Sequence, residues 1–252
     1  MNLRRLEEIS QNASRPERGL MIDGWSVGLS PGVAKRSRCV NPFYPSARPF
    51  AENLATAKAA FASAGLPCVF RLTPFVADPA IDTALDAIGC AQFDTTLVQA
   101  LPLAELRLDH VRPVAGQLRS HDNFAQAAAW VGEMRGDNPA EAEALAVRWR
   151  YCAGEVTPLF AYDEPGARIA RSVSITEDGH IGIFDVGTLS SHRNRGFAGA
   201  LIAHQLSAAR DAGVHTAYLQ VTPENPSRSL YERFGFRTVY EYWYRALPDA
   251  PK

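Results

Sequence analysis

The chain has 252 residues, of which 46% are apolar and 21% are charged, and its formal net charge is -1. This composition is ordinary for soluble globular proteins, and the length is sufficient for two domains of common size. The near-zero net charge excludes a global field that would draw the protein onto nucleic acid or an anionic membrane, although it leaves a local basic cluster open. We therefore expect neither nucleic acid nor a membrane as a partner.

The sequence indicates no targeting segment and no membrane span. Residues 1–8 contain no apolar run of signal-peptide length, and no stretch approaches the roughly 18 uninterrupted apolar residues of a membrane helix. The four cysteines, Cys39, Cys68, Cys90 and Cys152, lie far apart and show no metal-ligand spacing. Widely spaced single cysteines are typical of reduced thiols, so we expect a cytoplasmic protein without a metal.

In the first half, the predicted elements alternate between helix and strand. They are a helix over 51–64, a strand over 68–72, a helix that ends at 88–89 and a strand that finishes at Pro102. Gly65 and the pair Thr73-Pro74 supply turns between them, since glycine and proline end regular elements. Residues 109–113 indicate a connector, which predicts two domains, 1–108 and 109–252.

The second half begins with hairpin-like turns at 163–166 and 177–180. A helix over 196–212, a strand over 216–221, a short helix that ends near 234–235 and a strand that runs to Pro248 follow. These later elements repeat the order of the first half. Gly65 and Gly213 are 148 residues apart, Thr73 and Thr222 are 149 apart, and Gly89 and Gly235, like Pro102 and Pro248, are 146 apart. Four landmarks in the same order indicate tandem copies, each a mixed α/β unit.

One segment of the second copy carries a candidate anion site. The predicted strand over 181–188 is followed by a tight loop and by the helix that begins at Gly196. Small residues at 196 and 198–200 allow a ligand to approach the backbone closely. Unpaired amides at the start of a helix, together with the helix dipole, suit a pyrophosphate, and Arg193 and Arg195 add positive charge.

Two motifs in this copy resemble those of one enzyme superfamily. Arg193-x-x-Gly196-x-Ala198 resembles the (Q/R)xxGx(G/A) signature of the GNAT acetyltransferases. The segment 224–236 resembles a second motif of that superfamily, which combines an asparagine with a Leu-Tyr pair and a Gly-Phe pair. One helix and one strand separate the motifs, as in the superfamily, and the resemblance covers about residues 111–247.

The resemblance implies that the chain binds acetyl-CoA as a cosubstrate. It implies that the strand containing Val186, Gly187 and Thr188 pairs with the pantetheine arm as though with an added strand. The residues expected to hold the pyrophosphate are Arg193, Asn194, Arg195, Gly196, Phe197, Ala198 and Gly199. Asn225 is expected to bond to pantetheine, and Tyr231 matches the general acid that protonates the departing CoA thiolate. A half-buried packing role is the alternative for Tyr231.

The general base is left open by the sequence. Some members of the superfamily carry a glutamate on the strand before the loop, but the matching position here is Gly182. Asp185, the catalytic candidate, and His180 on the same strand are substitutes, and a chain of water molecules is a third. A structural hydrogen bond to a neighbouring loop is the equal alternative for Asp185. His192 is expected to be a loop residue rather than a base.

The first copy lacks the chemical groups of the second. Pro49 stands where the second copy has its helix-start glycine, and it removes one amide. Ser46 takes the place of the loop arginine, and Leu85 takes that of the tyrosine. We therefore expect two tandem GNAT-like domains, each a mixed, mostly antiparallel sheet flanked by helices. The first domain is expected to be degenerate and to bind no acetyl-CoA.

These features predict an N-acetyltransferase that moves the acetyl group from acetyl-CoA to a primary amine by direct attack, without a metal or a covalent enzyme intermediate. The acceptor is a small molecule or a peptide, expected between residues 122–151 and the last strands. Aromatic residues available there are Trp130, Trp149, Tyr151, Tyr240, Tyr242, Trp243 and Tyr244. We expect a monomer or homodimer. The alternative is an acetyl-CoA-binding regulatory module without turnover.

Overall fold

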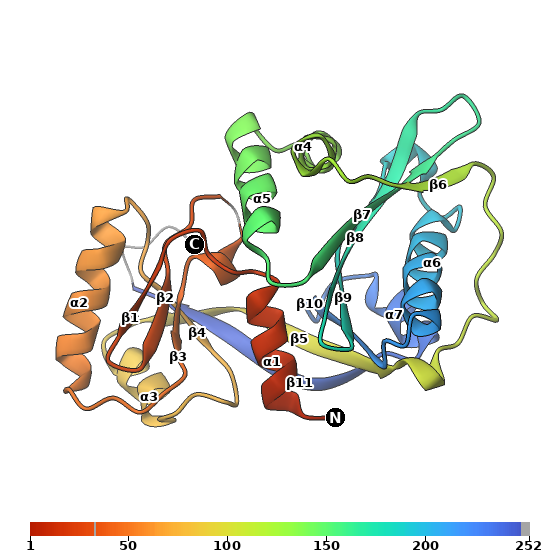
Figure 1. Cartoon of the computed structure of the whole chain (residues 1–252). Coiled ribbons are helices and arrows are strands. Elements are labelled where there is room, and N and C mark those ends of the chain that lie inside the picture. Colours follow the sequence, from red (N-terminus) through yellow and green to blue (C-terminus); the bar gives the residue numbers. More distant parts are fainter. Residues whose placement is uncertain (33, 248–252) are drawn as a thin grey trace.

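The computed structural model describes residues 1–32 and 34–247 (Figure 1). The α-helices are α1 (Leu3–Asn12), α2 (Phe50–Ser63), α3 (Ala80–Ala87), α4 (Phe124–Arg135), α5 (Pro139–Tyr151), α6 (Phe197–Asp211) and α7 (Arg228–Phe234). The strands are β1 (Gly19–Ile22), β2 (Trp25–Gly28), β3 (Val40–Pro42), β4 (Val69–Leu72), β5 (Ala91–Pro102), β6 (Gln117–Ser120), β7 (Glu155–Tyr162), β8 (Arg168–Glu177), β9 (His180–Thr188), β10 (Thr216–Val221) and β11 (Arg237–Ala246). The predicted alternation of helix and strand is thus confirmed. Pro248, the predicted end of the last strand, lies outside the described residues.

All of these strands belong to one sheet, in the order β1-β2-β3-β4-β11-β5-β10-β9-β8-β7-β6. Within it, β3 runs parallel to β4 and β9 runs parallel to β10, whereas every other neighbouring pair is antiparallel. The predicted hairpin turns at 163–166 and 177–180 connect β7 to β8 and β8 to β9. The prediction of a mixed, mostly antiparallel α/β fold is confirmed.

The final strands of the two copies are exchanged. β5 ends the first copy, yet it lies between β10 and β11. β11 ends the second copy and lies between β4 and β5. The exchange is reciprocal. Val69 of β4 pairs with Ala246 of β11. Their counterparts in the other copy, Tyr218 (149 residues after Val69) and Ala100 (146 residues before Ala246), pair in the same way. The sheet therefore runs unbroken through both copies, and the division into 1–108 and 109–252 stays a prediction.

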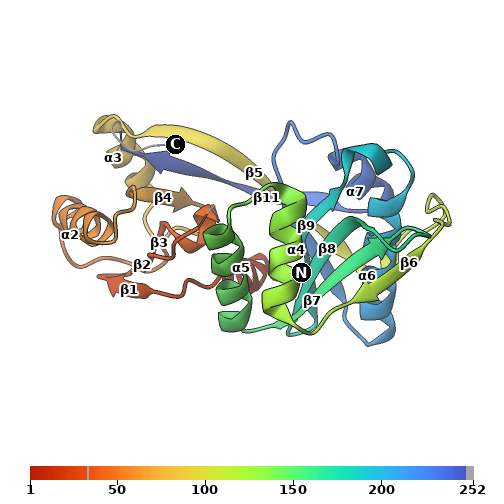
Figure 2. The same ribbon diagram turned by 90° about the horizontal axis from the view of Figure 1, so that it is seen from above.

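The helices cover the two faces of the sheet in two groups. Side chains alternate along a strand, so Tyr242 and Tyr244 of β11 lie in the cluster that contains α1, whereas Trp243 packs against the core beneath α2 and α3. Helices α6 and α7 lie on the same face as α2 and α3, and α4 and α5 lie on the face of α1. Seen from above, α4 and α5 lie in front of the sheet (Figure 2).

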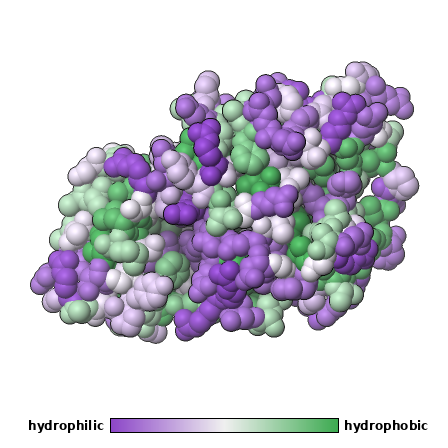
Figure 3. Space-filling model, viewed as in Figure 1, coloured by the Kyte–Doolittle hydropathy of each residue, from purple (hydrophilic) through white to green (hydrophobic). Residues whose placement is uncertain are grey.

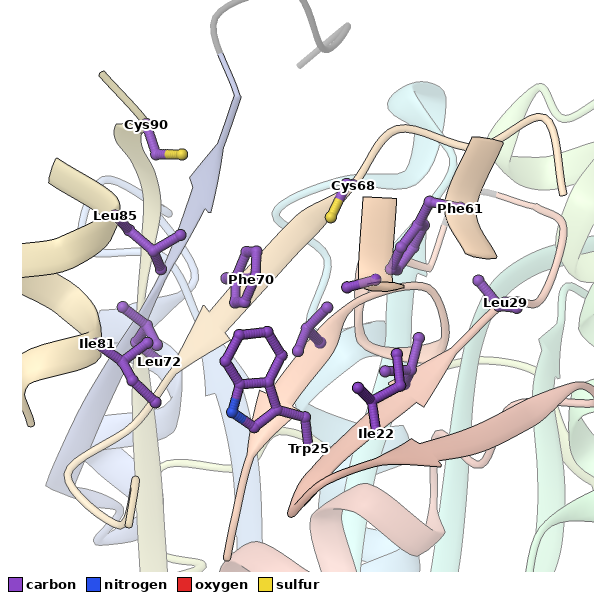
Figure 4. Close-up of a cluster of buried hydrophobic side chains, with 13 residues drawn as sticks. Ile22, Trp25, Leu29, Phe61, Cys68, Phe70, Leu72, Ile81, Leu85 and Cys90 are labelled. Carbon is purple, nitrogen blue, oxygen red and sulfur yellow. The ribbon is translucent and has the colours of Figure 1, made fainter. Parts of the chain in front are cut away.

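An apolar core holds α2 and α3 against the first strands (Figure 4). Trp25 of β2 packs edge-on against Phe70 of β4, with ring centres 5.3 Å apart. Phe61 of α2 and Leu85 of α3 close the cluster and are fully buried. Burial of each such side chain stabilises the fold by about 1.5–3 kcal/mol. The first copy is therefore a well-packed unit although it lacks the predicted chemical groups.

A buried ion pair connects α1 to the centre of the sheet. Glu7 of α1 and Arg71 of β4 are 2% and 0% exposed, and Arg71 Nη2 lies 3.2 Å from Glu7 Oε2. The Tyr240 hydroxyl of β11 donates to the same oxygen at 2.6 Å. Burial opposes the charge of Glu7, but the adjacent guanidinium outweighs it and lowers the pKa of the carboxyl. Helix α1 is thus fixed to one strand of each copy.

Within residues 1–32 and 34–247, no helix is both long and apolar enough to cross a membrane. In the same residues, no group of three or more His, Cys, Asp or Glu side chains is arranged to hold a metal ion. All four cysteines are free thiols, and Cys39, Cys68 and Cys90 are buried.

Candidate active site

Strands β9 and β10 separate in the middle of the sheet. They pair in parallel from His180 and Thr216 as far as Ile183 and Leu219. Beyond Ile183, the rest of β9 has no partner on this side among the described strands, so main-chain groups along residues 184–188 are unpaired there. We call this place, where β9 and β10 part, the opening. An extended ligand can add to such an edge through main-chain hydrogen bonds. Val186, Gly187 and Thr188, the residues expected to pair with pantetheine, all lie in this part of β9.

A β-bulge occupies the same part of β9. Gly187 pairs with Arg171 and Phe184 pairs with Val173, so Asp185 and Val186 together oppose a single residue of β8. Asp185 has φ +49°, in the left-handed region that few non-glycine residues adopt. A bulge leaves an extra residue unpaired and redirects the chain, and bulges often lie beside functional sites.

The loop after β9 presents a row of backbone amides. Asn194 and Gly196 both have left-handed φ, +61° and +87°, and α6 begins directly after them. Ala200 is the first residue bonded into the helix, from its N–H to Gly196 O at 2.9 Å. The amides of 194–199 donate no hydrogen bond to any residue that the structure describes. Consecutive free amides at the start of a 15-residue helix form an anion-binding concavity.

The side chains of this loop leave the amides accessible. Phe197 is buried beneath the helix start and anchors it, while residues 193–196 are exposed. Arg195 lies over the Phe197 ring, 5.5 Å from its centre, and Arg193 Nε donates to Thr188 O at 3.4 Å. Ala198 and Gly199 are half-buried, and a Cβ at Gly199 would lie 3.7 Å from Leu230 of α7. The predicted pyrophosphate residues are therefore brought together, next to α7.

Asn225 lies on the exposed turn between β10 and α7. Its Oδ1 accepts a hydrogen bond from the Ser227 backbone N–H at 2.8 Å. This bond holds the side chain in place, and the side-chain NH2 group makes no contact of its own within the described residues. The residue is thus oriented as a hydrogen-bond donor towards solvent.

Tyr231 lies on α7, in the core cluster that also includes Val186. Its side chain is 8% exposed, and its hydroxyl makes no hydrogen bond among the described residues. Unlike the hydroxyl of Tyr218, it is not fully enclosed. Burial raises the pKa of Tyr231 above its ordinary value, so the hydroxyl keeps its proton at neutral pH.

The carboxylate of Asp185 is held by an arginine from α4. Arg135 Nη1 lies 2.9 Å from Asp185 Oδ1, and the same guanidinium pairs with Asp137. The side chains of Asp185 and Arg135 are 18% and 25% exposed. Of the two roles left open for Asp185, this contact supports the structural one, although its partner is a helix end rather than a loop.

Tyr218 of β10 fills the space beside Gly182, the position considered above for a general base. A Cβ atom at Gly182 would lie 2.7 Å from the Tyr218 hydroxyl oxygen, so a larger side chain does not fit there. This hydroxyl is fully enclosed and has no partner among the described residues. No sequence motif marks Tyr218, because it lies on the neighbouring strand.

The two candidate histidines lie elsewhere. His180 begins β9, at the end remote from the bulge, where its ring packs against His215 with centres 4.8 Å apart. His192 lies in the loop before α6, and its Nδ1 contacts Ser191 Oγ at 2.9 Å. Neither contact involves the opening between β9 and β10.

Most of the aromatic residues expected near an acceptor are packed in the core. Trp130 and Trp149 pack beneath α4 and α5, and Tyr242 lies under the Arg71 guanidinium at 3.7 Å. Trp243 Nε1 donates to Asp82 at 3.2 Å. Tyr151 is the exposed member of the group, at 47%.

In the first copy, a carboxylate occupies the equivalent helix start. Asp23 accepts hydrogen bonds from the backbone N–H groups of Ala47 and Arg48, at 3.1 and 2.8 Å, and from Asn53 Nδ2 at 2.9 Å. The bonds from Asn53 and the two amides lower the pKa of Asp23. Residues 47 and 48 correspond to 194 and 195 by the 147-residue offset of the helix starts. The sequence predicted the lost amide at Pro49 but not this internal anion.

Residues 128–236 match the family model described as the acetyltransferase (GNAT) family. A search of curated proteins finds no match. The chain is similar in structure to a GCN5-related N-acetyltransferase from Kribbella flavida, with a TM-score of 0.69 and 16% identity over 98% of this chain and 95% of that one.

Two further solved structures are similar over most of the chain. One is a tandem GNAT protein from the clavulanic acid biosynthesis pathway, with a TM-score of 0.58 and 14% identity over 84% of this chain and 76% of that chain. The other is a GCN5-related N-acetyltransferase from Sphaerobacter thermophilus, with a TM-score of 0.56 and 17% identity over 85% and 74%. At these identities the likeness shows the fold alone.

Proposed function

We propose that this chain transfers an acetyl group from acetyl-CoA to the primary amine of an acceptor by direct attack, because residues 128–236 match the family model of the GNAT acetyltransferases. The observation that carries the proposal is the row of unbonded amides at 194–199 beside the opening between β9 and β10. A pyrophosphate needs such donors, and an extended pantetheine arm needs such a strand edge.

The parts of the cosubstrate have separate binding elements in this proposal. The amides of 194–199 hold the pyrophosphate, with Arg193 and Arg195 adding positive charge. The free edge of Val186 and Thr188 pairs with the pantetheine arm, and the Asn225 side-chain amide donates to it. The left-handed φ of Asn194 and Gly196 supports this assignment, because it turns successive N–H groups towards one side.

Tyr231 acts as the general acid. The acceptor nitrogen attacks the thioester carbonyl carbon, the carbon–sulfur bond breaks, and the sulfur takes the hydroxyl proton of Tyr231. The hydroxyl of Tyr231 is protonated at neutral pH, as that of an ordinary tyrosine with a pKa near 10 is, and no protein partner holds its proton. A free thiol has a pKa near 8.5, so protonation favours departure of CoA at neutral pH.

The attacking amine must lose a proton, and no side chain of the site is a clear acceptor for it. Asp185 is engaged by Arg135, and Gly182 has no side chain. We therefore favour water as the carrier of this proton, with Asp185 as the alternative. An α-amine, with a pKa near 7.7–8.0, needs less help than a lysine-like amine near 10.4.

The first copy binds no acetyl-CoA in this proposal. Asp23 already occupies two of its amides, and Pro49 lacks a third. The first copy instead supplies β5 and the wall of the acceptor site. A monomer or homodimer, and a cytoplasmic location, remain predictions from the sequence.

The decisive experiment measures binding and turnover separately. Calorimetry is expected to show one molecule of acetyl-CoA bound per chain. Thiol release in the presence of a broad amine panel is expected to rise above hydrolysis without an amine. Binding without thiol release on any amine would instead support the alternative, a regulatory module. Absence of binding would contradict both.

A further inference from the structure

Four arginines surround the β9 bulge on the face of the sheet that α4 and α5 cover. We call Arg36, Arg135, Arg148 and Arg171 the arginine cluster. Arg135 pairs with Asp185, and the Arg171 guanidinium lies against Gly187, where an added Cβ would be 2.6 Å from Nη1. Arg148 of α5 is close enough for its charge to interact with Asp185, Arg36 and Arg135. Arg36 lies 5.6 Å from the centre of the Phe184 ring.

The positive charge of the arginine cluster is not balanced within the described residues. Arg135 alone has carboxylate partners, Asp137 and Asp185. Arg171 is 8% exposed, its Nε is enclosed and unpartnered, and its Nη1 reaches only Met134 O at 3.5 Å. Burial and nearby positive charge lower the pKa of Arg148, and burial lowers that of Arg171.

Arg148 also lines a small hollow between α5 and the residues Ser30, Pro31 and Ser37. The hydroxyls of Ser30 and Ser37 are already bonded, to the Glu17 N–H and to Ser14 O, and Glu17 lines the hollow without an ion pair to Arg148. The surface over α1, in the middle of the face seen in Figure 3, is mostly hydrophilic.

An enclosed, unpaired cation is costly, and a bound anion removes that cost. The planar guanidinium of arginine presents two parallel N–H donors, which fit a carboxylate or a phosphate. The enclosed hydroxyl of Tyr218, 5.9 Å from Phe184 between ring centres, is a second polar group without a partner. Both observations indicate that a polar ligand completes this region.

The arginine cluster and the expected pyrophosphate loop lie on opposite faces of the sheet. Ser172 of β8 bonds to Gln205 of α6 at 2.7 Å, whereas its neighbour Arg171 contacts α4 on the other face. The β9 bulge lies between the two regions. An anion bound by the arginine cluster would thus lie on the face that α4 and α5 cover, apart from the loop that begins α6.

We propose that the acceptor is a small amine that carries its own anionic group, a carboxylate or a phosphate, and that Arg148 and Arg171 bind that group. This inference rests on the proposed acetyltransferase activity and names the class of its acceptor. The anion held by the guanidinium groups places the neighbouring amine beside the bulge in β9. Asp185 neutralises Arg135, so that Arg148 and Arg171 are left to the substrate.

The test compares acceptors with and without an anionic group. The anionic set is the twenty common amino acids and O-phosphoethanolamine. The counterparts that lack the anion are L-leucinamide for leucine, glycinamide for glycine and ethanolamine for O-phosphoethanolamine. We expect thiol release with at least one anionic amine at a kcat/KM about tenfold or more above that of its counterpart. Preference for an amino acid identifies a carboxylate, and preference for O-phosphoethanolamine identifies a phosphate.

Two variants on α5 assign the preference to a residue. Arg148→Gln is expected to raise KM for the preferred anionic amine by about tenfold to a hundredfold, because it removes a charge-assisted bond. The affinity for acetyl-CoA, measured by calorimetry, stays unchanged, which excludes a role in binding the phosphates of CoA. Arg150→Gln, two residues along on the exposed side of the same helix, serves as the matched control. Thermal unfolding verifies that both variants are folded.

Equal use of amines with and without the anionic group, or an unchanged KM in Arg148→Gln, overturns this inference while the acetyltransferase activity stands. A loss of acetyl-CoA affinity in Arg148→Gln overturns it as well, because the cluster would then serve the cosubstrate. Absence of thiol release with every amine removes the proposed activity and this inference with it.

Discussion

Tyr231 combines a buried ring with a hydroxyl that has no protein partner. Such a hydroxyl is available for proton transfer only while it is protonated, which a tyrosine is at neutral pH, and burial raises its pKa further. The ring packs against Phe236, with centres 6.3 Å apart, which limits its movement. The residue is thus positioned by packing and not by a hydrogen bond.

We predict that Tyr231→Phe lowers kcat by about 10²–10⁴ with little change in acetyl-CoA affinity, because the substitution removes only the proton donor. Steady-state kinetics and calorimetry measure the two quantities. Tyr44→Phe, at a side chain of the first copy that is 63% exposed, is the control and is expected to retain full activity. An unchanged kcat in Tyr231→Phe would leave the tyrosine with a packing role alone.

Glu7 illustrates how a single buried charge contributes to stability. The pKa of Glu7 is lowered in the folded protein. The carboxylate therefore contributes to the free energy of unfolding at pH values above its unfolded-state pKa near 4.3, and this contribution is lost as the pH falls towards the folded-state pKa. We predict that Glu7→Gln destabilises the protein by about 3–5 kcal/mol at pH 7, because Arg71 is left buried without a counter-charge.

Urea unfolding at pH 7 and at pH 4 measures this effect. The difference in stability between the original protein and Glu7→Gln should be smaller at pH 4, where part of the contribution of Glu7 is lost. Glu8→Gln, whose side chain is 65% exposed, is expected to change stability little. Equal losses for the two variants would exclude a special role for the buried pair.

At the scale of elements, the start of α6 depends on the left-handed φ of Gly196. Proline fixes φ near -65° and has no N–H, so Gly196→Pro both distorts the loop and removes a donor. We predict that its Kd for acetyl-CoA, measured by calorimetry, rises about tenfold or more. Gly213→Pro imposes the same change of φ at the other end of α6 and is expected to leave the Kd nearly unchanged. Comparable effects of the two would mean that general destabilisation, not the loop, is responsible.

The sequence was informative about elements because turn residues mark their ends. Gly65, Gly89, Gly213 and Gly235 all adopt positive φ, which few other residues tolerate, so the landmarks of the repeat are physically required positions. The strand-loop-helix order around Gly196 could be predicted for the same reason. Local chemistry therefore predicts local structure well.

Contacts between distant residues could not be predicted in this way. Arg36, Arg148 and Arg171 lie on separate elements without a shared motif, and only the folded sheet brings them to one bulge. Asp23 is likewise separated from the amides that it fills by more than twenty residues. Tyr218 reaches Gly182 because β9 and β10 are neighbours in the sheet. The alternation of side chains indicates which face of a sheet a residue lies on, but not which strand lies beside it.

At the scale of the whole molecule, the sheet depends on both copies. The residues 109–252 alone would lack β5, so β11 would have neither of its neighbours, and one edge of β10 would be bare. Unpaired strand edges promote aggregation. We predict that this fragment forms no folded monomer, as measured by circular dichroism and size-exclusion chromatography. Co-expression of residues 1–108 is the control and should restore a soluble complex. A folded monomeric fragment that binds acetyl-CoA would contradict the prediction.

The reciprocal strand exchange also explains how a copy without chemistry can persist. In the proposed function only the second copy performs the reaction, so substitutions at the helix start of the first copy cost no activity. Deletion of that copy was not equally free, because the same deletion would remove an interior strand from the working half. On this proposal, selection on the activity of the second copy also preserves the fold of the first copy, in which Asp23 now fills the amides of the helix start.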